Sequence, residues 1–210
     1  MKKFDHYILL SKLFEYPKHS LEGAADELSG FVVQTFPELK EKAGKFLSSV
    51  RGLSFHDQQE YYMNTFDVKA IIALDLGYLI FGEDYKRAEI LVNLQKEHQN
   101  AGIDCGTELG DHLPNILQLI AKTEDEEFRE ELGFIITRPC VRFMLTKFKD
   151  RGNYYEHLLE ILSGILQSDF DSDQLKEYEF AEERFDVKNE FIMPSPKAGI
   201  CQSNCKHIRN

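Results

Sequence analysis

The stretch ELGDHLPNILQLI, residues 108–120, decides the fold class, because it combines a helix start with a complete buried helical face. Its apolar residues recur at positions i, i+3, i+4 and i+7, the spacing of one side of an α-helix: Leu113, Ile116, Leu117 and Ile120. Asp111 is the predicted N-cap, and Pro114 is tolerated because first-turn amides have no helical partners. The segment therefore predicts a buried helix that begins with a polar turn.

Helical spacing continues on both sides of this segment. Further helices are expected to begin near Ser20, Pro37 and Ser54, and an amphipathic helix is expected over residues 85–100. One stripe along this last helix is formed by Ala88, Leu91, Val92 and Gln95. Two further apolar residues, Ile90 and Leu94, lie beside the stripe. A more polar helix is expected over 173–185, and Pro139 is expected to break or kink its own segment.

Strand signals are missing from the sequence, since no stretch alternates strictly with β-branched enrichment and no Asn-Gly or Asp-Gly hairpin occurs. The sequence therefore predicts an all-α, single-domain helical bundle of about eight to ten helices over residues 1–185. Residues 186–210 lose helical periodicity around Pro194 and Pro196 and are expected to form an irregular C-terminal tail.

Charge and composition exclude several classes of function. The 210 residues carry 36 acidic and 25 basic side chains, a net charge of −11, which argues against nucleic-acid binding and suits a basic partner or simply solubility. No apolar stretch is long enough to span a membrane, and charged residues interrupt the N-terminal apolar run too early for a signal peptide. Four cysteines without an export signal predict a reducing cytoplasm.

Enzyme signatures are weak. The sequence has no phosphate-binding glycine loop, no G-x-S-x-G and no H-E-x-x-H. An α-helical metal-dependent phosphohydrolase using Asp111 and His112 is the enzyme alternative, although the pair has the reverse of the usual His-Asp order. In the tail, Cys201, Cys205 and His207 are weak metal candidates, because zinc prefers four ligands and only three lie close together.

The polar turn before Leu113 has two interpretations. In the structural one, Asp111 caps the helix and Glu108 lies near its positive end. In the functional one, the turn exposes Asp111 and His112 as a recognition corner, where Asp111 holds the imidazole ring or pairs with an incoming arginine. The residues alone leave both interpretations open.

Five short motifs occur in a fixed order along the first 120 residues. They are Leu13-Phe14-Glu15-Tyr16-Pro17, Tyr62-x-x-x-Phe66-Asp67, Gly82-Glu83 followed by Arg87-Ala88 and Leu91, Asn100-Ala101-Gly102, and Glu108-Leu109-Gly110-Asp111-His112-Leu113-Pro114. This series resembles the nitrate reductase delta-subunit (NarJ-type) assembly chaperones, within the wider TorD/DmsD family of molybdoenzyme maturation chaperones. Gly110 stands where the family signature has a proline, so a less rigid loop is expected.

The resemblance implies an all-helical cytoplasmic chaperone rather than an enzyme. Such a protein binds the Arg-containing N-terminal leader, or leader remnant, of a molybdoenzyme catalytic subunit and keeps it competent for molybdenum cofactor insertion. It holds no tightly bound cofactor itself, and cofactor-delivery proteins are further partners. The implied peptide-binding residues combine the polar turn with an aromatic pair: Glu108, Asp111, His112, Tyr62, Phe66 and Asp67. A helical subunit that stays permanently in its complex is a third interpretation.

Overall fold

The computed structural model describes residues 4–68, 70–148 and 152–180. Within these ranges the chain is helical and contains no strand beyond one isolated β-bridge, which confirms the predicted all-α class. The α-helices, in chain order, are α1 (His6–Phe14), α2 (Glu22–Thr35), α3 (Lys40–Arg51), α4 (Phe55–Phe66), α5 (Leu76–Phe81), α6 (Tyr85–Asn100), α7 (Leu113–Lys122), α8 (Glu126–Glu131), α9 (Arg138–Phe148) and α10 (Tyr155–Asp169). A 3-10 turn (Pro37–Leu39) precedes α3 and a π-helical segment (Leu132–Thr137) precedes α9. The predicted tail, 186–210, lies outside the described residues.

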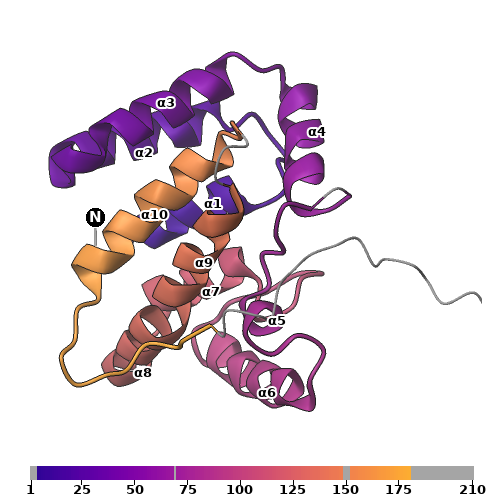
Figure 1. Ribbon diagram of the computed structural model, residues 1–210, viewed down its shortest axis with the longest axis vertical. Coiled ribbons are helices and arrows are strands. Elements are labelled where there is room, and N and C mark those ends of the chain that lie inside the picture. The colour runs from indigo at the N-terminus through magenta and orange to yellow at the C-terminus, as the bar shows by residue number, and fades with distance from the viewer. Residues whose placement is uncertain (1–3, 69, 149–151, 181–210) are drawn as a thin grey trace, which may run out of the picture. The chain divides into compact units, whose positions relative to one another are not determined.

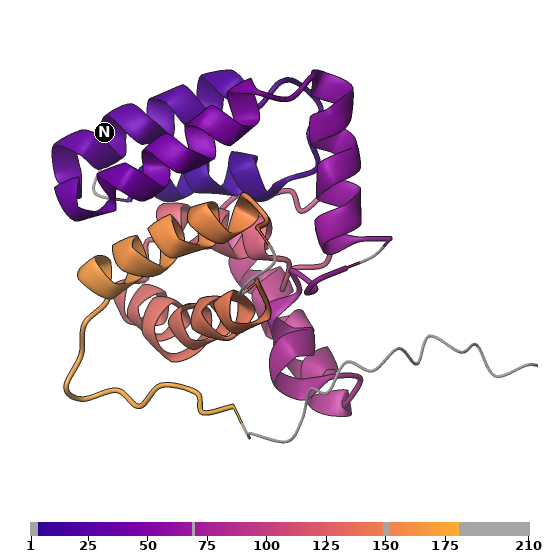
Figure 2. The same cartoon turned by 45° about the horizontal axis from the view of Figure 1, so that its top comes forward.

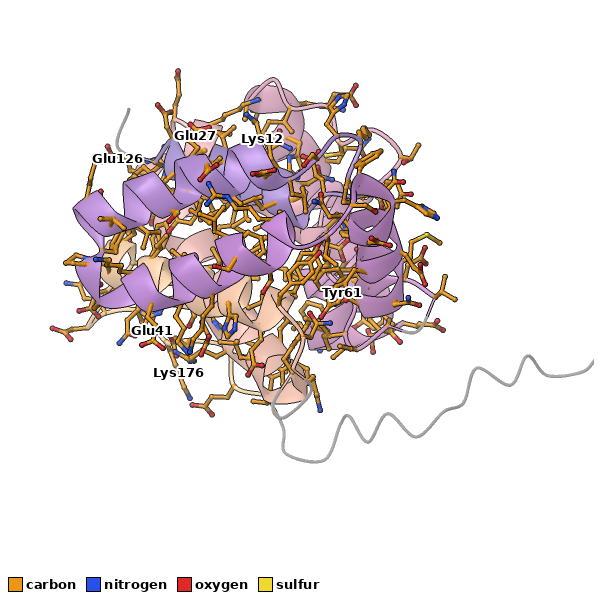
Figure 3. All side chains as sticks on the ribbon, turned by 90° about the horizontal axis from the view of Figure 1, so that it is seen from above. Lys12, Glu27, Glu41, Tyr61, Glu126 and Lys176 are labelled. Atoms are coloured by element: carbon orange, nitrogen blue, oxygen red, sulfur yellow. The ribbon has the colours of Figure 1, made fainter. Side chains whose placement is uncertain are left out.

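The core is built around α1 and α7. These two helices pack against each other, and α7 is buried along most of its length, as its periodicity predicted. Helix α2 packs on α1 and on α3, and α10 packs on both α3 and α9 (Figures 1 and 2). Charged side chains project from the outer helical faces (Figure 3), among them Lys12, Glu27, Glu41 and Glu126.

Two helices at the edge of this core carry much of the site described below. Helix α4 begins at Ser54, whose hydroxyl oxygen accepts from the Asp57 amide while the Asp57 carboxylate accepts from the Ser54 amide, a complete capping box. Helix α6 packs on α5 and buries only Leu94 and His98 (Figure 1). In the predicted stripe of α6, Ala88, Val92 and Gln95 are exposed, whereas Leu91 is half-buried.

The structure corrects the expected polar helix over 173–185. Residues 171–180 are not helical, and they lie along α9, where the Phe180 ring stacks on Phe143 at 4.3 Å between centroids. The Tyr178 amide donates to the Ile135 carbonyl at 3.0 Å. These tertiary contacts replace the hydrogen bonds that a polar helix would have made.

The expected distortion near Pro139 takes the form of the π-helical segment at Leu132–Thr137. Proline lacks the amide that would continue the helical ladder, and the preceding turn widens. Gly133 lies in this turn because a Cβ there would lie 2.6 Å from the Phe170 ring.

Loss of the capping box is expected to weaken α4 without changing the fold. Ser54→Ala leaves the Asp57 amide without its acceptor, and we expect the free energy of unfolding to fall by about 1 kcal/mol. Urea denaturation measures this change. Ser48→Ala is the matched control, since Ser48 is exposed in the last turn of α3 and its hydroxyl donates to the Gly44 carbonyl. An equal loss in both variants would contradict the capping role.

Candidate functional site

An isolated antiparallel bridge brings Asp75 and His112 together from distant parts of the sequence. The Leu76 amide donates to the Asp111 carbonyl and the Leu113 amide donates to the Leu74 carbonyl, both at 2.9 Å. Residues directly opposite in such a bridge point to the same face. Asp75 Oδ1 therefore lies 3.0 Å from His112 Nδ1, and Nε2 is the ring nitrogen left to a ligand.

Asp111 is not exposed, and this corrects its predicted place in the recognition corner. Its side chain is 1% accessible, and Oδ2 accepts from Nε of Arg87 at 2.9 Å while Oδ1 accepts from Nη2 at 3.3 Å. Gly77 makes room for this pair, because a Cβ there would lie 2.6 Å from Oδ2 of Asp111. Asp111 is also not the N-cap of α7: His112 holds that position, without a side-chain cap bond.

Helix α6 fixes the polar turn at two points. Arg87, near the start of α6, binds Asp111. His98 lies near the end of α6, and its Nε2 atom is 2.9 Å from the Gly110 carbonyl oxygen. Gly110 itself rests against the His98 ring, since a Cβ there would lie 3.3 Å from the ring carbon Cδ2. Burial lowers the pKa of His98, although the bond to Gly110 opposes this. A neutral His98 therefore donates to the Gly110 carbonyl and holds the turn where the family signature has a proline.

The turn borders a surface groove of about 650 Å³, which we call the acidic groove. It is lined by the segment that follows α1, by α4, by the residues before α5, by the loop before α7 and by α7 itself. Its lining is rich in carboxylates and aromatic rings: Glu15, Tyr16, Lys18, Tyr62, Phe66, Asp67, Ala73, Leu74, Asp75, Asp104, Cys105, Gly106, Thr107, Glu108, His112, Pro114, Asn115 and Gln118. Among these residues, five are Asp or Glu and one is Lys.

Most of the residues singled out in the sequence converge here. Five of the six implied peptide-binding residues line the acidic groove, and Asp111 lies beneath it: the five are Tyr62, Phe66, Asp67, Glu108 and His112. Glu15 and Tyr16, from the first sequence motif, line the same groove. Motifs separated by about a hundred residues along the chain thus form one surface.

Aromatic rings form the apolar part of the groove. Tyr16 packs edge-on against Tyr62 at 5.6 Å between centroids, and Tyr62 lies 5.2 Å from Phe66. Tyr16 is 42% exposed, whereas Tyr62 is 7% and Phe66 is 9% exposed. Tyr16 is therefore the most accessible aromatic contact, and Phe66 serves mainly as packing.

Several carboxylates of the groove act on the Tyr62 hydroxyl. Burial raises the pKa of Tyr62, and nearby carboxylates raise it further, those of Glu108, Asp67, Glu15 and Asp75. The phenol consequently stays protonated and is a hydrogen-bond donor. Such a concentration of carboxylates favours a cationic ligand and disfavours phosphate or other anions.

Three residues of the site were not predicted from the sequence. Asp75 and Asp104 line the groove, and Arg87 holds Asp111 below it. Arg87 was visible as part of a family-like motif, but its partner lies 24 positions away. Asp75 lies 37 positions from His112, and no local pattern marks that pairing.

The described residues give no support to the phosphohydrolase alternative. They contain no group of three or more His, Cys, Asp or Glu side chains arranged to hold a metal ion. The Asp111 carboxylate binds the Arg87 guanidinium through both of its oxygens. The weak tail candidates, Cys201, Cys205 and His207, lie outside the described residues.

Acid is expected to remove the contribution of Asp75 to stability. Burial raises the pKa of this carboxyl, but the hydrogen bond and charge of His112 and the charge of Arg87 outweigh it and lower the pKa below its ordinary value of 3.8. A carboxyl whose pKa is lowered in the folded state stabilises the protein at a pH above its unfolded-state pKa. This stabilisation is lost as the pH falls through the folded-state pKa.

Urea denaturation of wild type and Asp75→Asn over a range of pH measures this effect. The difference in free energy of unfolding should be largest near neutral pH and should shrink below pH 3.8. A difference that stays constant with pH would contradict the pairing.

Comparisons with known proteins find relatives by sequence. The chain is 27% identical over 174 residues to the nitrate reductase molybdenum cofactor assembly chaperone NarJ of Escherichia coli K12, covering 81% of the chain and 73% of that protein. The protein of the same name from Escherichia coli O157:H7 matches equally. No protein-family model matches the chain, and among the described residues no helix is long and apolar enough to cross a membrane. The matches confirm the resemblance carried by the sequence motifs, because the chain is similar in sequence to NarJ-type nitrate reductase assembly chaperones over most of its length.

Proposed function

We propose that this protein is a cytoplasmic chaperone that binds the N-terminal leader, or leader remnant, of a nitrate reductase-like molybdoenzyme catalytic subunit. The single observation that carries the proposal is the acidic groove, where five carboxylates and an accessible tyrosine meet around His112. In this proposal the bound subunit stays competent for molybdenum cofactor insertion and assembly.

The chemistry of the groove fits an Arg-containing, partly apolar peptide. A guanidinium forms paired hydrogen bonds with carboxylates and stacks on aromatic faces, so it matches Glu108, Asp67 and Tyr16 together. A groove of this kind receives an amphipathic helix through a few anchoring side chains. Charge complementarity speeds the encounter and fixes the orientation of the peptide.

The residues have different roles in this proposal. Glu108 and Asp67, both exposed, contact arginine side chains of the leader. His112 offers Nε2 to a backbone or side-chain group of the peptide, because Asp75 engages Nδ1. Asp111 acts as a positioning residue through Arg87 rather than as a contact.

The proposed role needs no catalytic step. The protein makes and breaks no covalent bond, and the molybdenum cofactor belongs to the client subunit. The name of the relative, a nitrate reductase molybdenum cofactor assembly chaperone, supports this assignment at the level of cofactor assembly. Cofactor-delivery proteins are additional partners in the proposal.

Calorimetric titration tests the proposal from the peptide side. The probe is an N-terminal peptide of a nitrate reductase-like catalytic subunit from the organism that encodes this chain, with a control peptide in which glutamine replaces each arginine. We expect the native peptide to bind and the control to lose at least about tenfold in affinity, equivalent to about 1.4 kcal/mol. Equal binding of both peptides, or binding of neither, would contradict the proposal.

Co-purification separates a chaperone from a permanent subunit. A chaperone is expected to accompany the cofactor-free catalytic subunit and to be absent from the active reductase complex. Stoichiometric recovery with the active complex would instead support the permanent subunit.

A further inference from the structure

A second groove, of about 620 Å³, lies between α6 and the loop that precedes α7, and we call it the α6 groove. It shares Asp104, Cys105, Gly106 and Glu108 with the acidic groove. The loop over residues 104–108 is therefore a wall common to both grooves. A peptide that crosses this wall meets both surfaces.

The two grooves differ in chemistry. The acidic groove has carboxylates from several elements. In the α6 groove the only charged lining residues of the described chain are Asp104 and Glu108, both on the shared wall, and His98 is neutral. Leu91, Val92 and Leu109 supply apolar surface to the α6 groove.

Two of these apolar side chains are among the exposed large hydrophobic residues of the described chain. Val92 is 54% and Leu109 is 49% exposed, and both line the same groove from different elements. An exposed apolar patch with a polar rim is typical of a binding surface. Here the rim includes the acidic wall, so the apolar patch and the carboxylates form one continuous surface with an apolar part and an acidic part.

We infer that the α6 groove receives the apolar side chains of the same leader peptide whose arginines occupy the acidic groove. This inference rests on the proposed function and adds to it the chemistry of the ligand: a peptide with a basic part and an adjoining apolar part, which spans residues 104–108. The contact between His98 and the Gly110 carbonyl joins the floor of the α6 groove to the turn that carries His112.

Titration with two peptides tests the inference. One is the native N-terminal leader peptide, and the other keeps its arginines but has serine in place of its large apolar residues. The protein variant is Val92→Gln with Leu109→Gln, which removes apolar contact without adding charge beside the carboxylates. Val33→Gln on α2, at a site 43% exposed, is the matched control.

We expect the double variant to bind the native peptide at least about tenfold more weakly than wild type does, because two partly buried aliphatic contacts are lost. The serine peptide should bind wild type and the double variant equally, and Val33→Gln should behave as wild type. If the double variant binds the native peptide as tightly as wild type does, the inference is overturned while the proposed function stands. If wild type binds neither peptide, the proposed function itself fails. A change in oligomeric state without a change in peptide affinity would assign the patch to a second copy of the chain and overturn the inference.

Discussion

Arg87→Met is expected to lower the free energy of unfolding by roughly 3–5 kcal/mol, because it leaves the Asp111 carboxylate buried without its cation. Asp111 is 1% accessible and Arg87 is 17% accessible at the side chain, so water does not replace the lost partner. The second substitution Asp111→Asn, made in the Arg87→Met background, should restore much of the loss by removing the buried charge. Urea denaturation of the three proteins measures both steps.

Arg142→Met is the matched control for this prediction. Arg142 also pairs with a carboxylate, that of Glu177, but its side chain is 50% exposed. Exposed ion pairs contribute about 0–1 kcal/mol. A loss in Arg87→Met no larger than in Arg142→Met would mean that the pair beneath the groove does not hold the turn.

Reversing two charges of the acidic groove is expected to weaken leader binding by roughly 100-fold, or about 2.7 kcal/mol. The variant is Asp67→Lys with Glu108→Lys, and its effect combines the loss of two guanidinium contacts with repulsion of the arginines. Calorimetric titration with the native peptide measures the change. Circular dichroism before titration shows whether the variant keeps its helices.

The matched control carries the same change of net charge at remote positions. Glu27→Lys with Glu126→Lys places lysines on α2 and α8, on outer faces of the molecule (Figure 3). At about 0.15 M salt, charges separated by more than about 8 Å are largely screened, so this control should bind almost as wild type does. Equal weakening in both variants would show that net charge, rather than the groove, attracts the peptide.

Local patterns predicted the helices well. The i, i+3, i+4, i+7 spacing of Leu113–Ile120 identified α7 because a buried helix needs one apolar face wherever it lies in the fold. The cap at Ser54 was equally readable, since its bonds stay within one turn. The polar segment 173–185 misled the prediction, because packing of Phe180 and Tyr178 on the rest of the chain outweighed local helix propensity.

Several residues of the groove could be predicted from the sequence, but the hydrogen bonds and ion pairs between them could not. Tyr62, Glu108 and His112 were identified through family-like motifs, and they do line one cavity. Asp111 satisfied a local capping rule, yet Arg87 captured its carboxylate from 24 positions away. Pairings over such distances leave no periodic signal in a single sequence, so the buried role of Asp111 emerged only from the fold.

The most direct test of the central claim is photo-crosslinking of the leader peptide to the intact protein. The peptide carries benzoylphenylalanine in place of the residue beside its first arginine, and mass spectrometry locates the crosslinked segments. The account predicts adducts within residues 15–18, 62–67, 73–75, 104–108 or 112–118, the segments that border the acidic groove. Adducts concentrated on the α2–α3 pair, or spread evenly over the surface, would contradict it.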